Sequence, residues 1–178
     1  MKTLKIILVL TALSLYSVEG MAKNMGSFSK LSGSNLEGKK YDIPKSFEGK
    51  YNIVFVAFQR QQQVLINSWL PLVKSVTEKY PDTKYYELPV LNEGYKFFSG
   101  IIDGGMRSGI PDKKARESTI TVYGPKSKFM KEMKIKDDKN IHIFVLDNKG
   151  EIIWRSIGAM NDETKKEATD LFTKLYKD

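Results

Sequence analysis

The chain has 178 residues, a formal net charge of +8 and no cysteine. Without a thiol it cannot perform disulfide exchange or thiol peroxidase chemistry, because both begin from a cysteine thiolate. The length suits one ordinary domain that folds without disulfide support. The lysines are spread along the whole chain, which is typical of a solvated surface and identifies no particular anionic partner.

The first 20 residues have the pattern of a secretory signal. Two lysines precede an apolar run at Ile6–Leu15, and small residues follow near Gly20; cleavage after Ala22 is the alternative. The run is shorter than the ~20 residues that span a bilayer. We therefore predict a signal peptide at 1–20 and a periplasmic or extracellular protein. A basic protein there could meet anionic lipids, cell-wall polymers or an acidic protein, whereas nucleic acid is not an expected partner.

The first half of the chain predicts two buried strands around one long helix. Residues 21–35 are rich in Ser, Gly, Asn and Lys and are predicted to form a flexible lead-in. Pro71 should kink the helix, because proline removes one backbone donor. The hydrophobic pattern places an edge strand at 36–44, a buried strand at 52–58, the helix at 61–79 and a second strand at 84–90.

The second half predicts further alternation of helices and strands. A helix at 92–102 leads into residues 103–112, whose glycines predict a loop or an interrupted helix. This order favours an α/β fold, a three-layer sandwich with a central mixed sheet flanked by helices, over one domain at 36–178. The remaining elements are a strand at 119–123, a short helix at 126–134, a hairpin of strands at 140–146 and 151–157, and a last helix capped by Asn161 or Asp162.

The element order resembles the thioredoxin-like superfamily. The residues that carry the resemblance are Leu36-Glu37-Gly38-Lys39 before the buried strand, Phe55–Phe58 in it, Pro71 in the helix, and the turn Asp147–Gly150. A redox thioredoxin has Cys-x-x-Cys directly after the buried strand and a cis-proline facing it. Here the strand is followed by Gln59–Gln63, and there is no proline near Ile141. The resemblance therefore implies the fold, without the redox site.

A closer resemblance is to cysteine-less thioredoxin-like proteins related to the mitochondrial ATP synthase assembly factor. It is carried by VAFQRQQQVLINSW at Val56–Trp69 and by DGGMRSGIPDKKARESTITVY at Asp103–Tyr123. That family implies a chaperone-like role, without enzymatic activity, toward a membrane-embedded Fo subunit. For this chain we take from it the fold and the non-enzymatic character.

The first candidate binding segment follows the buried strand. Ligands of open α/β sheets collect at the carboxyl ends of strands, and the amides of a helix N-terminus favour anions. An arginine there could hold a carboxylate or phosphate, although an exposed polar helix start is the alternative. The segment consists of Gln59, Arg60, Gln61, Gln62 and Gln63.

The second candidate segment is the glycine-rich stretch and its continuation. It has neither the ending of a phosphate-binding loop nor the spacing of a dinucleotide loop. A long glycine-rich connection is often functional; the alternative is a structural loop with internal ion pairs, such as Asp112 with Arg116. The candidate binding residues are Asp103, Arg107, Asp112, Lys113 and Arg116.

No catalytic centre is predicted. His142 is the only histidine, and it lies within a predicted strand without a second histidine or a cysteine to act with it. The acidic residues form no cluster with it, and no serine has a base partner or lies in a G-x-S-x-G turn. We expect no catalytic residue, no metal and no cofactor.

Two functions remain open. The first is an exported binding protein that holds a protein partner, such as a subunit of an envelope or membrane complex, during assembly. The second is a small-anion binder or enzyme that reuses the vacant thioredoxin cleft, with Arg60, Arg107 and Arg116 holding the anion.

Overall fold

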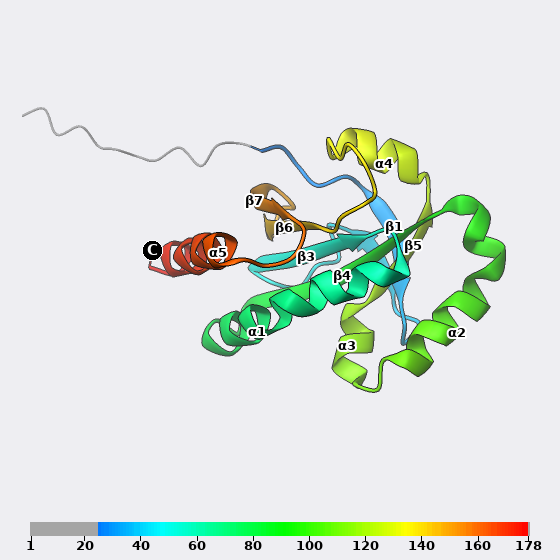
Figure 1. Ribbon diagram of the computed structural model, residues 1–178, viewed down its shortest axis with the longest axis horizontal. Coiled ribbons are helices and arrows are strands. Elements are labelled where there is room, and N and C mark those ends of the chain that lie inside the picture. Colours follow the sequence, from blue (N-terminus) through cyan, green and yellow to red (C-terminus); the bar gives the residue numbers. More distant parts are fainter. Residues whose placement is uncertain (1–24, 178) are drawn as a thin grey trace, which may run out of the picture.

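A seven-stranded mixed sheet forms the centre of the protein (Figure 1). The computed structural model describes residues 25–177, so the signal peptide predicted at 1–20 lies outside the described residues. In sheet order the strands are β2 (Lys40–Ile43), β1 (Leu31–Asn35), β5 (Ile120–Gly124), β4 (Thr83–Asn92), β3 (Tyr51–Ala57), β6 (His142–Asp147) and β7 (Ile152–Ile157). The pairs β3–β4 and β4–β5 are parallel, and the other pairs are antiparallel.

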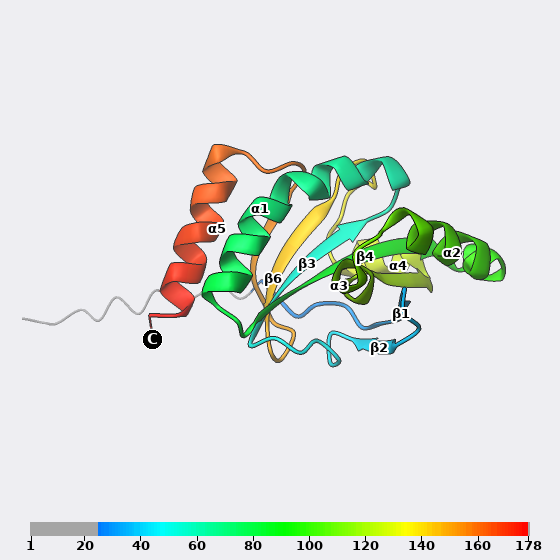
Figure 2. The same ribbon diagram turned by 90° about the horizontal axis from the view of Figure 1, so that it is seen from below.

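Helices cover both faces of this sheet, which confirms the predicted three-layer α/β architecture. Figure 2 shows α1 (Gln63–Lys79) and α5 (Asp162–Leu175) side by side on one face. The opposite face packs against α4 (Lys126–Glu132). The connections contain α2 (Ser99–Gly109), α3 (Lys113–Ser118) and the 3-10 helices η1 (Arg60–Gln62) and η2 (Glu93–Phe98).

The two faces of β3 anchor two separate hydrophobic clusters. Phe55 packs with Trp69 of α1 and Phe172 of α5, and the Trp69 indole donates a hydrogen bond to the Gly158 carbonyl at 3.0 Å. Val54 belongs to the cluster on the other face, which includes Phe28, Phe129 and Phe144. Each fully buried side chain of this size stabilises the fold by about 2 kcal/mol. This core holds β3 rigidly, and with it the connection to α1.

Most predicted elements are confirmed, some with shifted ends. The helix predicted at 61–79 is α1, which continues through Pro71. Asn161 caps α5: its side chain accepts a hydrogen bond from the backbone of Thr164 at 2.8 Å. The predicted hairpin is β6–β7, with Gly150 at a positive φ of 84° in the turn.

The prediction of a flexible lead-in was wrong for Leu31–Asn35, which forms β1. Its sequence, LSGSN, lacks the apolar alternation that marks strands, and its position is set by pairing with β2 and β5. Gly33 permits this pairing, because a Cβ there would lie 2.7 Å from the Thr121 carbonyl oxygen. The close approach of β1 to its neighbouring strands therefore produces this strand, and such an approach has no clear hydrophobic pattern in the sequence.

The prediction of a loop or broken helix at 103–112 was also wrong in part. Helix α2 continues through Gly104 and Gly105 and ends at Gly109, and α3 begins at Lys113. Each glycine disfavours a helix by about 1 kcal/mol relative to alanine. The helix nevertheless contains four glycines among its 11 residues and buries none of its side chains. It is therefore a helix with low intrinsic stability.

Gly104→Ala is expected to stabilise α2 by about 1 kcal/mol, since alanine costs less backbone entropy and no atom lies within 4 Å of the added Cβ. Hydrogen exchange of the α2 amides should slow. Gly150→Ala is the contrasting variant: its Cβ would lie 2.4 Å from Pro44 Cγ at a positive φ, so it should lower Tm. Unchanged exchange in Gly104→Ala would show that α2 is not helical in solution.

Candidate functional site

A helical arm, defined here as residues 93–109 (η2 and α2), lies at the edge of the molecule with its apolar side chains uncovered. None of its residues is buried. Phe97 is 95% exposed and Ile101 77% exposed, and Tyr95 and Phe98 are more than half exposed. In Figure 1 the arm is the green segment at the outer right. Adjacent exposed apolar side chains of this size mark surfaces that bind partners.

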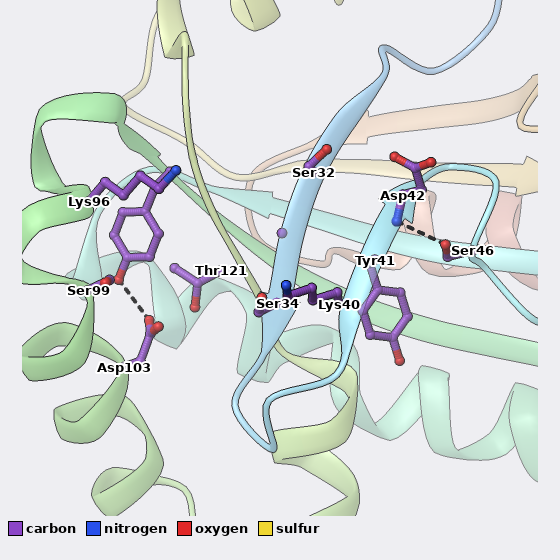
Figure 3. A pocket seen from close by; sticks show the side chains of 12 residues that line it. Ser32, Ser34, Lys40, Tyr41, Asp42, Ser46, Lys96, Ser99, Asp103 and Thr121 are labelled. Carbon is purple, nitrogen blue, oxygen red and sulfur yellow. Dashed lines mark hydrogen bonds between the residues drawn. The ribbon is translucent and has the colours of Figure 1, made fainter.

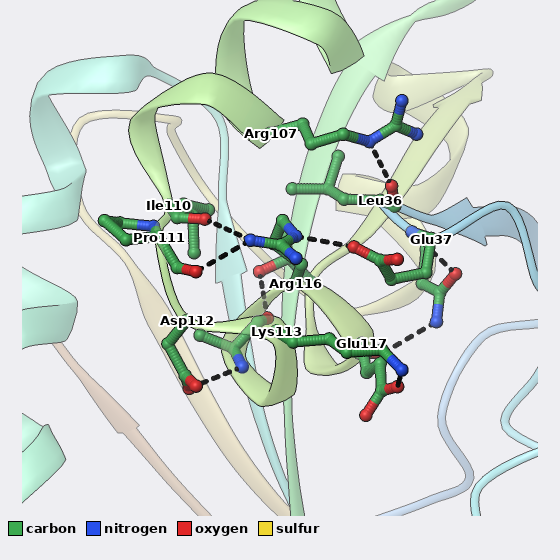
Figure 4. Close-up of polar contacts among 12 residues, drawn as sticks. Leu36, Glu37, Arg107, Ile110, Pro111, Asp112, Lys113, Arg116 and Glu117 are labelled. Atoms are coloured by element: carbon green, nitrogen blue, oxygen red, sulfur yellow. Dashed lines mark hydrogen bonds and ion pairs between the residues drawn. The ribbon is translucent and has the colours of Figure 1, made fainter.

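Two polar contacts join the arm to β5 and to the turn after β1. The Tyr123 hydroxyl donates to Asp103 Oδ1 at 2.7 Å (Figure 3). Burial and the neighbouring Asp103 carboxylate raise the pKa of Tyr123 above its ordinary value, so the hydroxyl remains a donor. Arg107 Nε donates to the Leu36 carbonyl at 2.6 Å (Figure 4). Asp103 and Arg107, both predicted as binding residues, thus hold the arm in place.

An apolar cleft of about 560 Å³ lies between the arm, the start of α1 and β4. It lies beside the carboxyl end of β3, where the sequence predicted a binding site. Gln59, Arg60 and Gln63 contribute polar groups to its lining, and Gly105 and Gly109 present the arm's backbone to it. Its apolar lining includes Ile66, Val90, Leu91, Ile101, Ile102, Met106 and Ile110. The cleft therefore joins the two predicted segments in one largely apolar site.

The carboxyl group of Glu87, which was not predicted as a site residue, also lines this cleft. Glu87 is only 7% exposed, on β4 beside Phe55 of β3 and Thr119. Gln63 Nε2 donates to Glu87 Oε2 at 3.2 Å. Burial raises the pKa of Glu87 above its usual 4.5, although the Gln63 hydrogen bond opposes this effect. Strand alternation offered a signal, because Glu87 points to the opposite face from the buried Tyr86 and Leu88.

The glutamines after β3 mainly fix the backbone. Gln62 is 3% exposed; its Oε1 accepts from the Phe58 amide at 2.8 Å and its Nε2 donates to the Asp138 carbonyl at 2.8 Å. Gln59 Nε2 also donates to that carbonyl, at 3.1 Å, and Gln61 donates to the Gln59 side chain. Amides therefore clamp the connection in which a redox thioredoxin has cysteines. Of the five predicted residues, Gln59, Arg60 and Gln63 reach the cleft.

The remaining predicted residues build the junction between α3 and the turn after β1 (Figure 4). Arg116 Nη1 donates to the carbonyls of Ile110 and Pro111 at 2.9 and 2.8 Å, and its Nε lies 2.5 Å from Glu37 Oε1. The suggested Asp112–Arg116 ion pair is thus replaced by a longer-range pair.

Asp112 and Lys113 have local roles in the same junction. Asp112 caps α3 by accepting from the Ala115 amide at 2.9 Å. Lys113 Nζ lies 3.6 Å from Glu117 Oε1 on the exposed side of α3. Neither residue lines the cleft. The charge-rich half of the second predicted segment therefore stabilises α3 and joins the α2–α3 connection to the turn after β1.

A second hollow, of about 720 Å³, borders the arm and is lined mostly by residues with polar groups (Figure 3). Its lining includes Ser32 and Ser34 of β1, Thr121 of β5, and Lys96 and Asp103 of the arm. Buried Thr121 Oγ1 has no hydrogen-bond partner among residues 25–177. Arm residues therefore line both hollows.

His142 is buried in β6 and packs edge-on against Phe58 at a ring-centroid distance of 6.2 Å. Burial, and to a smaller degree Arg155, lowers the pKa of His142. No group of three His, Cys, Asp or Glu side chains suited to hold a metal occurs in the described part of the chain. None of the helices within residues 25–177 combines the length and apolarity needed to cross a bilayer.

Comparison with known proteins gives a family. The family described as ATP10 protein matches residues 22–175. The chain belongs to the ATP10 protein family. A search of curated proteins gave no match.

Solved structures show that this ATP10 family member has a thioredoxin-like fold. Yeast Sco1 with copper bound is similar with a TM-score of 0.55 and 15% identity, covering 85% of this chain and 94% of that one. The exposed lipoprotein thioredoxin of Streptococcus pneumoniae has a TM-score of 0.53 and 14% identity, covering 82% and 99%. An SCO1/SenC family lipoprotein from Bacillus anthracis has a TM-score of 0.54 and 7% identity, covering 84% and 94%.

Glu87→Gln in this ATP10 family member should raise the free energy of unfolding at about pH 7 by on the order of 1 kcal/mol, the cost of one poorly compensated buried polar group. The pKa of the Glu87 carboxyl is higher in the folded protein than in the unfolded chain. The protein is therefore most stable at pH values below the unfolded-state pKa, and it loses stability as the pH rises through the folded-state pKa. The gain should therefore shrink as pH falls toward 4.5. Urea unfolding across this pH range measures it.

Glu93→Gln, at an exposed carboxyl on the arm, is the matched control and should change stability little. A loss of stability in Glu87→Gln at neutral pH would contradict the prediction, because it would mean that the carboxylate is already compensated.

Proposed function

We propose that this ATP10 family protein is an exported, non-redox binding module that holds an apolar segment of a protein partner in the cleft beside its helical arm. The partner is a subunit of a membrane complex, and binding assists its assembly. The observation that carries the proposal is the combination of an apolar cleft with uncovered apolar side chains on the arm that borders it. A peptide segment in the cleft would contact both.

The arm suits such a role because polar contacts hold it while none of its side chains is buried. It buries no side chain, and its glycine-rich helix gains little intrinsic stability. Gly105 and Gly109 let a partner approach the arm's backbone closely. The contacts at Asp103 and Arg107 join it to β5 and to the turn after β1. Binding a partner would supply the apolar contacts that the arm lacks.

Three further observations support an assembly role outside the cytoplasm. The chain has no cysteine, so its thioredoxin-like fold serves something other than thiol chemistry. Membership of the ATP10 family, with the resemblance to ATP synthase assembly factors, favours a protein client. The pattern of residues 1–20 favours export. The described residues contain no helix suited to span a membrane, so in this proposal the partner supplies the membrane segment.

The anion-binding alternative receives less support from the same geometry. Arg107 and Arg116 donate to backbone carbonyls at the junction with the turn after β1, and only Arg60 reaches the cleft. Glu87 lines the cleft, and its negative charge would repel an anion.

Affinity capture from a detergent-solubilised envelope fraction of the native host tests the proposal. Gly105→Leu adds a bulky side chain at a position that lines the cleft, whereas Gly104→Leu adds it at the neighbouring position, which does not line the cleft. We expect wild type and Gly104→Leu to retain the same membrane-complex subunit, and Gly105→Leu to retain about tenfold less of this subunit. Matched Tm values ensure that all three are folded.

Equal retention by the three proteins would contradict binding in the cleft. Equal loss in both leucine variants would also contradict it, because the effect would then follow the arm's helix and not the cleft.

A further inference from the structure

Glu87 places a negative group in apolar surroundings at the base of the cleft. Its side chain is more than nine-tenths buried, and Ile66, Val90 and Met106 line the same cleft. Water, which normally compensates a carboxylate, has little access to it. A buried carboxylate is unfavourable unless hydrogen bonds or an opposite charge offset its loss of hydration.

The protein itself supplies only weak compensation. The Gln63 amide is neutral and donates at 3.2 Å, near the long end of the hydrogen-bond range. Glu87 takes part in none of the ion pairs formed by residues 25–177. Arg60 lines the same cleft, yet its side chain is exposed and is also absent from those ion pairs. Among residues 25–177, Glu87 is therefore an acidic group in the cleft with no ion-pair partner.

Charge complementarity defines what would fit. A neutral apolar segment would displace the remaining water and leave the carboxylate poorly paired, and an acidic segment would be repelled. A segment with one lysine or arginine among apolar residues would bury its apolar flanks against the cleft and place its cation beside Glu87. Because the surroundings are apolar, this attraction would be stronger than at an exposed site.

We propose that the cleft selects a partner segment that is apolar except for one cationic side chain, and that Glu87 forms the ion pair with it. The inference rests on the proposed function of the cleft and adds the chemistry by which it recognises its client. Glu87 then serves both specificity and register, since only one position along the segment can meet it.

Small probes test the charge selectivity without the natural partner. Hexylammonium and 1-hexanol have the same alkyl chain and differ in charge, and NMR of methyl-labelled protein reports binding at Ile66, Ile102 and Met106. Glu87 is ionised to a greater extent at about pH 8 than at lower pH. At this pH we expect hexylammonium to bind about tenfold more tightly than hexanol at these methyl groups. Glu87→Gln should reduce this preference to within about twofold, and the control Glu93→Gln should retain it.

Several outcomes would overturn the inference. These are no binding of hexylammonium in the cleft at millimolar concentration, equal binding of the two probes, or a preference that persists in Glu87→Gln. A further contradicting outcome is a measured Glu87 pKa that is ordinary in wild type and rises in Arg60→Gln. Arg60 would then already form the ion pair with Glu87 in the absence of a partner. Equal binding of the two probes, with loss of captured partner in Gly105→Leu, would remove the charge selectivity while leaving partner binding in the cleft intact.

Discussion

The parallel pairing of β3 with β4 and of β4 with β5 is the constraint on which the rest of this structure depends. Parallel strands require long crossover connections, and their carboxyl ends lie at one edge of the sheet. That edge therefore receives the start of α1 and the start of the helical arm. The cleft lies between these two connections, and β4 places Glu87 at its base. The hydrophobic clusters on both faces of β3 keep this arrangement fixed.

Glutamine side chains occupy the connection after β3, where redox thioredoxins have cysteines. The buried Gln62 amide ties the end of β3 to the Asp138 carbonyl, and Gln59 reinforces it. Amides suit this position because each offers both a donor and an acceptor to backbone groups that would otherwise be buried without partners. These hydrogen bonds fix the connection that borders the cleft.

Much of the fold could be predicted because its signals are local. The apolar run of β3, the hairpin turn at Gly150 and the cap at Asn161 each depend on neighbouring residues. The passage of α2 through Gly104 and Gly105 could not be predicted, since four glycines among its 11 residues oppose helix formation.

The candidate site was predicted in part for the same reason. The end of β3 was identified from topology, whereas the roles of Arg107 and Arg116 depend on groups 71 and 79 residues away in sequence. Glu87 was missed because one acidic residue in a strand gives no motif; its significance comes from its burial and from its lack of an ion pair among residues 25–177. Local patterns thus locate the edge of the sheet that forms the site, and three-dimensional contacts decide which of its residues face a ligand.

Site-specific photocrosslinking in the native host tests most directly whether the cleft and its arm bind an envelope protein. A photoreactive residue at Ile101, which is exposed and lines the cleft, is compared with one at Lys166, which is exposed on α5. The expected result is a crosslink from position 101, mapped by mass spectrometry to an apolar segment of one envelope protein, and none from position 166. Equal crosslinking from both positions, or none from position 101, would contradict the cleft as the binding site.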